Sequence, residues 1–161
     1  MATTTRVAKG GQRASERYRE VAARLVEEAG VETVLENRSS LSGRAWAKTK
    51  TISVPPPNTL RRLYIHAHEC AHVALDHRGR LSSHRQEFEA ERWAHEALAR
   101  HGLEVPPAAD EAARKYVAWK VTQAIRRGAK AIDKEALTFA RKYVSARDYD
   151  FARDCPRPVA R

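Results

Sequence analysis

The sequence predicts an α+β fold in which a small antiparallel sheet packs against helices, with two extra basic helices toward the C-terminal end. Three observations support this class. Short strand-like segments are gathered between residues 31 and 54, an apolar segment with helical spacing follows at 60–75, and glycines and prolines divide the last third of the chain into helical segments. A chain of 161 residues buries about 70% of the surface that it exposes when unfolded, so no disulfide is needed to hold a core.

The N-terminal part is expected to be a flexible leader followed by a helix. Residues 1–12 are polar and carry no apolar stretch. An amphipathic helix is expected over about 15–29, because Val21 and Leu25 belong to one apolar stripe and Gly30 suits the position after a helix end.

Three short strands are then expected to form the sheet, at residues 31–36, 45–48 and 51–54. The turn-rich segment 37–43 separates the first two. Pro55-Pro56-Pro57 ends the sheet, and Asn58 is expected to cap the apolar helix that follows.

Another helix is expected from Ser83 to about His101. Ser83 and Gln86 have the spacing of an S-x-x-Q capping box, and Gly102 closes the helix. Pro106-Pro107 marks a boundary after it.

The C-terminal part is expected to hold two basic helices, at about 110–127 and from the N-cap Asp133 to about Val144, with a frayed tail after Arg147. Between residues 112 and 142 there are nine basic residues and two acidic ones, within a chain whose formal net charge is +10. Such a field attracts acidic partners, DNA or RNA first among them. The alternative is a solvated helix face that only confers solubility.

The compartment is expected to be the cytoplasm. The N-terminal segment lacks the apolar core of a secretory signal, and no apolar run approaches the length of a membrane span. The only cysteines are Cys70 and Cys155, which favours a reducing environment.

The segment His68-Glu69-Cys70-Ala71-His72 carries the chemistry of the chain. It is an H-E-x-x-H motif, and residues four apart on a helix lie about 40° from each other around its axis, so both imidazoles can bind one ion. Glu69 lies beside that face, where a carboxylate can reach a water without binding the metal. This arrangement is typical of a zinc peptidase; the alternative is a helix whose histidines are ordinary core or surface groups.

A catalytic zinc ion usually takes three protein ligands, so the histidine pair needs a third. Glu89, seventeen residues after His72, borders the apolar face formed by Ala90, Trp93 and its neighbours. We therefore expect His68, His72 and Glu89 to hold Zn²⁺. The alternative is that Glu89, like Glu87 and Glu91, is a surface charge.

These residues resemble the ImmA/IrrE-type metallopeptidases, which combine H-E-x-x-H with a helix of the form E-A-x-x-F-A. The matching residues are His68, Glu69 and His72 with the run Glu89-Ala90-Glu91-Arg92-Trp93-Ala94, and the resemblance covers about 31–103. It departs from the family in having no clear helix-turn-helix segment. The resemblance implies a zincin-like, zinc-dependent domain at 13–105 that cleaves DNA-binding repressor proteins. The leader at 1–12, a basic helical extension at 106–147 and a tail at 148–161 would flank it.

His84 is the rival third ligand. The run His84-Arg85-Gln86-Glu87-Phe88 is similar to the H-G-x-x-F element of SprT-like proteases, which act on proteins crosslinked to DNA, although Arg85 replaces the glycine. Both resemblances imply proteolysis near DNA.

In the expected mechanism Glu69 is the general base, and the oxyanion takes a further donor from Tyr64, His95 or Tyr116, between which the sequence does not choose. His66 lies about 160° from His68 and is expected at the surface or behind the ligands, as is His77. Cys70 is expected to be a small buried group. The three tryptophans are expected to be core or rim anchors rather than base-stacking groups.

The function predicted from these patterns is a zinc-dependent endopeptidase that cleaves a regulatory or DNA-associated protein. The alternatives are a nucleic-acid-binding protein of a mobile element with a structural or vestigial metal site, and an interaction protein that binds one partner without cleaving it.

Overall fold

The computed structural model describes residues 5–37, 41–79 and 82–155, with side chains from residue 11 onward. By their internal contacts the residues form two compact units, one comprising Met1–Asp76 and Trp93–Pro106 and the other His77–Arg92 and Pro107–Arg161. Helix α3 (Ser83–Arg100) contributes to both units. The fold class is α+β, as predicted, and it is mostly helical.

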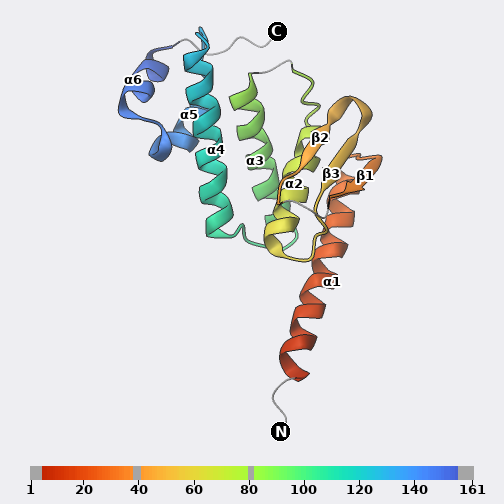
Figure 1. Cartoon of the computed structure of the whole chain (residues 1–161). Coiled ribbons are helices and arrows are strands. Elements are labelled where there is room, and N and C mark those ends of the chain that lie inside the picture. Colours follow the sequence, from red (N-terminus) through yellow and green to blue (C-terminus); the bar gives the residue numbers. More distant parts are fainter. Residues whose placement is uncertain (1–4, 38–40, 80–81, 156–161) are drawn as a thin grey trace. The chain divides into compact units, whose positions relative to one another are not determined.

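The described part of the first unit holds a three-stranded sheet and two complete α-helices, all of which are drawn in Figure 1. In chain order these are α1 (Thr5–Glu28), β1 (Thr33–Glu36), β2 (Arg44–Trp46), the short 3-10 helix η1 (Ala47–Thr49), β3 (Thr51–Val54) and α2 (Leu60–Ala74). Helix α2 contacts α1, β2 and β3. The predicted packing of a small sheet on helices is therefore confirmed.

The sheet is mixed, so the prediction of an antiparallel sheet was wrong. Its strand order is β1-β3-β2; β1 runs parallel to β3 and β2 antiparallel to it. The tight connection through η1 and Lys50, whose φ is 46°, reverses the chain between β2 and β3. The direction of β1 depends on the longer connection before β2, and strands this short carry no periodicity that reports direction.

The core of this unit forms where α2 meets the central strand and α1. Ile52 and Val54 alternate inward from β3, and Leu25, Leu63 and Cys70 from the helices are fully buried. Every residue of β1 is exposed. The strand that precedes the histidine helix is thus the best-anchored strand of the sheet.

The start of α1 and the capping residue of α2 differ from the predictions. Helix α1 begins at Thr5 rather than near residue 15. Glycines such as Gly11 lower the helix propensity, but unlike proline they keep their backbone N–H, so the helix can continue through them. Helix α2 is capped by Thr59, whose side chain accepts from the backbone N–H of Arg62 at 3.3 Å. The predicted cap, Asn58, instead accepts a hydrogen bond from the Arg62 side chain at 3.1 Å.

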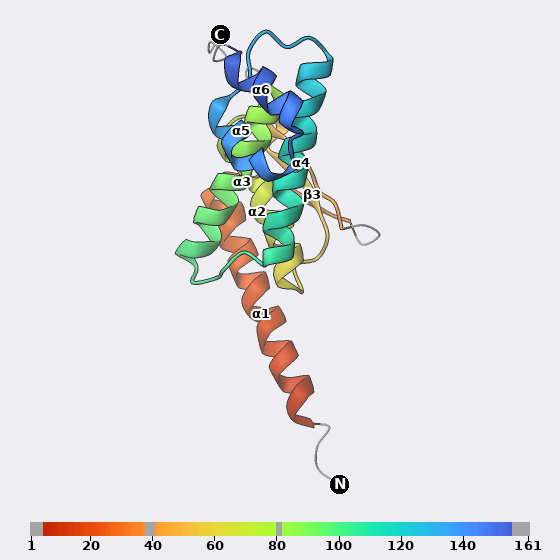
Figure 2. The same ribbon diagram turned by 90° about the vertical axis from the view of Figure 1, so that its left-hand side faces the viewer.

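Buried residues of three helices form the core of the second unit, and Figure 2 shows these helices. They are α4 (Pro107–Arg126), α5 (Lys134–Ala140) and α6 (Ala146–Asp154), with the 3-10 helix η2 (Arg141–Tyr143) after α5. Val117, Val121 and Ile132 are fully buried at its centre. Asp133 caps α5 as predicted, accepting from the N–H of Ala136 at 2.9 Å.

The end of this unit corrects the predicted frayed tail. Helix α6 continues to Asp154, with Ser145 as its N-cap. The Lys134 ammonium group donates hydrogen bonds to the carbonyls of Ala152, Arg153 and Cys155 at 2.5 to 2.6 Å, which satisfies carbonyls that a helix end leaves free. The rest of the predicted tail, 156–161, lies outside the described residues, as do 1–4 of the predicted leader.

Within the described part of the chain, every helix is too short or too polar to cross a membrane.

Candidate metal centre

A side-chain hydrogen bond of His66 connects α2 to the segment that follows β3. The Nε2 atom of His66 lies 2.8 Å from the carbonyl oxygen of Pro55, the residue that follows β3. Because the carbonyl can only accept, Nε2–H is the donor. His66 is buried, and burial lowers its pKa, so the ring is a neutral tie between the strand and the helix rather than the surface group that the sequence allowed.

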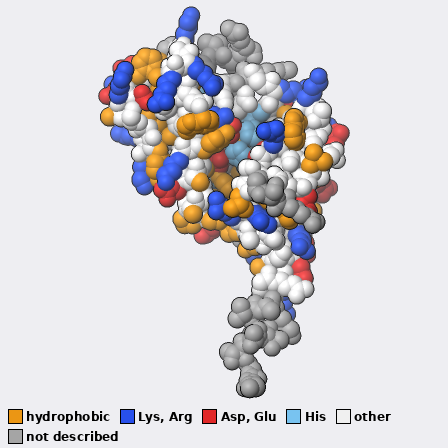
Figure 3. All heavy atoms as spheres, in the orientation of Figure 1, with side chains coloured by type: hydrophobic (Ala, Val, Ile, Leu, Met, Phe, Trp, Pro, Cys, Tyr) orange, Lys and Arg blue, Asp and Glu red, His pale blue; other side chains and the backbone are white. Residues whose placement is uncertain are grey.

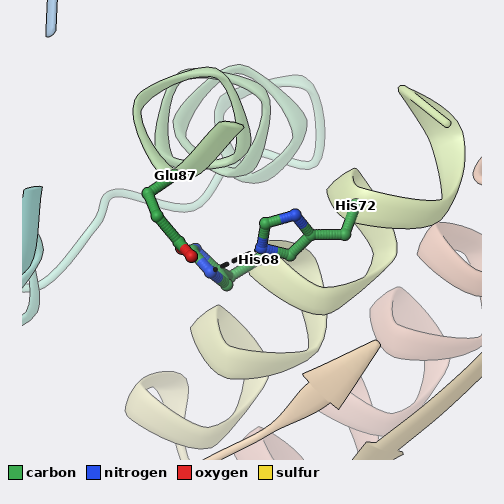
Figure 4. Close-up of side chains that lie close together, drawn as sticks. All are labelled: His68, His72 and Glu87. Atoms are coloured by element: carbon green, nitrogen blue, oxygen red, sulfur yellow. Dashed lines mark hydrogen bonds between the residues drawn. The ribbon is translucent and has the colours of Figure 1, made fainter. Parts of the chain in front are cut away.

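His68 and His72 lie together on α2, as the four-residue spacing predicts (Figure 4). Their Nε2 atoms are 3.2 Å apart, and the rings meet edge to face with centroids 4.9 Å apart. Two nitrogens that bind the same zinc tetrahedrally, with bonds of about 2.0–2.1 Å, are separated by about 3.3 Å. The pair therefore has the spacing of a metal chelate.

Glu69, which follows His68 on the same helix, is buried, with 7% of its surface exposed. Gly43, the residue before β2, lies directly against its side chain. A Cβ atom at Gly43 would stand 2.5 Å from Cγ and 2.6 Å from Oε1 of Glu69, closer than non-bonded atoms approach. A larger residue at this position would fit only if the Glu69 side chain moved.

Among the described residues, one group of three possible ligands has atoms close enough to share a metal ion. It joins Glu87 of α3 to His68 and His72, with all ligand atoms within 4.8 Å of one another (Figure 4). The Glu87 carboxylate also lies 3.5 Å from the Nζ atom of Lys120, in an ion pair whose side chains are largely covered.

Glu89, the expected third ligand, is not in that group. Its Oε1 accepts a hydrogen bond from Nε of Arg85 at 2.9 Å, and its Oε2 lies 3.2 Å from Nε2 of His77. Both oxygens of the carboxylate therefore have partners within the second unit. The His77 side chain is buried, so its contact is with Glu89 rather than with solvent.

His84, the rival ligand, supports the second unit. It is buried, and its Nε2 accepts the backbone N–H of Asp133 at 3.0 Å. The proton of the neutral ring therefore sits on Nδ1, and burial lowers the pKa of the ring. The lone pair that a metal would need is already used by the cap of α5.

The glutamates of α3 could have been sorted by helical spacing. Glu87 stands three, four and seven residues before Ala90, Glu91 and Ala94, all of which are buried, and these intervals define one helix face. Glu91 is buried too, although it was expected to be able to face water. The close approach of Gly43 to Glu69 leaves no comparable signal in the sequence.

The remaining predicted residues have mixed outcomes. Cys70 is fully buried, as expected, and burial, followed by the charges of Glu69 and Glu28, raises the pKa of its thiol to about 12. Tyr64 and His95, two of the possible oxyanion donors, make an edge contact with centroids 5.8 Å apart. Tyr116, the third, is exposed on α4.

Two of the tryptophans, Trp46 and Trp119, lie at the surface, with 41% and 49% of their area exposed.

Comparisons of the chain with protein-family models, with curated proteins and with solved structures gave no match.

Proposed function

We propose that the chain is a zinc-dependent endopeptidase of the H-E-x-x-H type, with a zincin-like site on α2. The observation that carries this proposal is the pair of histidine Nε2 atoms 3.2 Å apart, with Glu69, which stands between the two histidines in the sequence, buried on the same helix. A structural histidine pair would need neither this spacing nor an adjacent acid. The sequence motif and the spacing of the two nitrogens both support the proposal of a metal-dependent hydrolase.

His68, His72 and Glu87 form the proposed ligand set, in which Glu87 replaces the expected Glu89. Two imidazoles and one carboxylate are the donors found in many catalytic zinc sites, which keep a fourth position open. Glu87 is chosen because its oxygen lies within 4.8 Å of both histidine nitrogens, whereas both oxygens of Glu89 have partners. A bound zinc ion would lower the pKa of a water molecule toward neutrality and polarise a peptide carbonyl.

The protein's own contribution is the placement of a proton acceptor. In the proposed reaction, the Glu69 carboxylate takes a proton from the attacking water and delivers it to the nitrogen of the amine that leaves when the peptide bond breaks. Gly43 closes one side of this carboxylate and limits the rotamers that it can adopt. The side chain of the proposed base is thereby confined before substrate arrives.

The peptide substrate is proposed to bind along β2. This strand is an edge of the sheet, and it contacts α2, the helix that carries the histidines. An extended peptide can add to such an edge through backbone hydrogen bonds, which holds it straight for cleavage. As the sequence resemblance implies, the substrate would be a regulatory or DNA-associated protein, for example a transcriptional repressor.

The decisive experiment compares metal content with cleavage. Purified protein is incubated with a library of peptides, the cleaved bonds are identified by mass spectrometry, and bound zinc is measured by elemental analysis. Glu69→Gln should retain zinc and lose at least about a hundredfold in cleavage rate, because the general base is gone. Unchanged cleavage in this variant would exclude the proposed base.

A pair of matched variants tests the third ligand. Glu87→Ala should lower zinc content and activity together, while Glu89→Ala should retain zinc, because Glu89 pairs with Arg85 and His77. The reverse result would restore Glu89 as the ligand. Zinc that survives the double variant His68→Ala/His72→Ala would refute the proposed site.

A further inference from the structure

An exposed pair of stacked aromatic rings lies on α4. Tyr116 and Trp119 are 41% and 49% exposed, their ring centroids are 5.7 Å apart, and the planes are inclined by only 22°. The Nζ atom of Lys120 lies over both rings, 5.1 Å from the Tyr116 centroid and 5.4 Å from the Trp119 centroid. Neighbouring aromatic rings exposed to water form an apolar surface, and such surfaces often mark binding sites.

The pair belongs to a helix face that the core of the second unit does not use. Val117, Ala118 and Val121, which are buried at the level of the two rings, each lie at least about 100° around the helix from both Tyr116 and Trp119. At 100° per residue, Tyr116, Trp119 and Arg127 fall on one face.

Cations continue this face toward the end of the helix. Arg126, Arg127 and Lys130 are exposed, and none forms an ion pair with a residue in the described ranges. Figure 3 shows Lys and Arg side chains alternating with hydrophobic ones over the region of α4, α5 and α6. We call Tyr116, Trp119, Lys120, Arg126 and Arg127 the α4 platform.

We propose that the α4 platform binds single-stranded nucleic acid. Unpaired bases can stack on exposed aromatic rings whatever their sequence, and the cations farther along the same face can contact the phosphates. A duplex hides the faces of its bases, so it could use only the cations. An acidic protein segment would likewise use the charge and leave the rings unexplained. This proposal does not depend on the metal centre.

The test uses the full-length protein and a fluorescein-labelled fifteen-nucleotide oligo-dT, with binding followed by anisotropy at low salt. The double variant Tyr116→Ala/Trp119→Ala should weaken binding by about tenfold or more, because two stacking surfaces are removed. Trp46→Ala is the matched control, since Trp46 is a similarly exposed tryptophan, 41%, with Arg44 over its ring; its affinity should stay within about twofold. Circular dichroism confirms that each variant is folded.

A second pair of substitutions tests the charges separately from the rings. Arg126→Gln/Arg127→Gln should reduce the slope of log affinity against log salt by about 1.4, because each phosphate that is no longer neutralised lowers the slope by about 0.7. Chelation of metal should leave binding unchanged.

Four results would overturn the proposal: no binding of the oligonucleotide, equal affinity for a duplex of the same length, a ring-less variant that binds like the parent, or a poly-glutamate peptide that displaces the oligonucleotide at equal charge concentration.

Discussion

At the scale of single residues, the position of Glu69 depends on a residue that contributes no side chain. Gly43 approaches so closely that any Cβ would overlap the Glu69 side chain. Its φ is not among the positive values found in the described glycines, so the requirement is for space and not for an unusual backbone conformation. The side chain of the candidate base is therefore confined by its contact with Gly43 as well as by the helix that carries it.

Gly43→Ala should destabilise the protein by about 1–3 kcal/mol, the usual cost of overpacking a tight site. In the Glu69→Ala background the overlapping atoms are absent, so the same change should be neutral or stabilise by about 0.4–1 kcal/mol through the unfolded chain. Urea unfolding of the four proteins measures this cycle. Gly11→Ala is the control, because nothing lies within 4 Å of that position. An equal cost of Gly43→Ala in both backgrounds would contradict the steric account.

Sequence spacing was sufficient for the residues that share one helix turn and insufficient for those that meet through tertiary structure. The pairing of His68 with His72 follows from the helix period alone. The choice among Glu87, Glu89 and Glu91 depends on which face of α3 is covered. Helical spacing from Ala90 and Ala94 favours Glu87 and Glu91 over Glu89, but it does not choose between those two. Gly43 is distant in sequence from Glu69, and only the packed structure relates them.

At the scale of elements, His84 connects α3 to the start of α5 within the second unit. Its Nε2 accepts the N–H of Asp133, and the Asp133 side chain in turn caps α5. Protonation of Nε2 would replace this acceptor with a second donor. The junction therefore requires a neutral ring.

This junction predicts a loss of stability in mild acid. Burial lowers the pKa of His84, so the unfolded chain binds the proton more readily and stability rises with pH. The contribution is complete above about pH 6.5, the ordinary pKa of histidine, and is lost as the pH falls through the lower pKa of the folded state.

His84→Gln supplies a neutral acceptor and should reduce the dependence of unfolding free energy on pH, by up to about 1.4 kcal/mol per pH unit in that window. Urea unfolding at pH 7.5 and below pH 6.5 measures it. Some dependence should remain from His66, whose pKa burial also lowers. An identical slope in the parent and the variant would exclude the role of His84.

The helices were predictable where the chain marks their ends chemically. Asp133 caps α5, and Gly102, with φ 67°, follows α3 as expected. Helix α6 was not predicted because its sequence is polar on most sides and shows no clear apolar stripe. What holds its last turn is Lys134, a residue from another helix, and a contact of that kind has no local signature.

At the scale of the whole molecule, the proposed metal site brings together ligands from separate parts of the sequence. His68 and His72 belong to α2 and Glu87 to α3. An ion that binds three ligands in the folded chain, and cannot bind all three in the unfolded chain, stabilises the fold by mass action. Stability then reports on binding even when no substrate is known.

Zinc at a hundred times its dissociation constant should add about 2.7 kcal/mol, which for a chain of this size corresponds to a rise in melting temperature of about 5–10 °C. Differential scanning calorimetry with added zinc, and then with a chelator, measures this shift for each variant against its own zinc-free melting temperature. The comparison is valid even where a substitution changes the starting stability, as Glu89→Ala will by removing the partners of His77 and Arg85. The shift should vanish in His68→Ala/His72→Ala, shrink in Glu87→Ala and persist in Glu89→Ala. A shift of equal size in the histidine double variant would mean that zinc stabilises the protein from some other site, and the chelate geometry on α2 would then have no bearing on its stability.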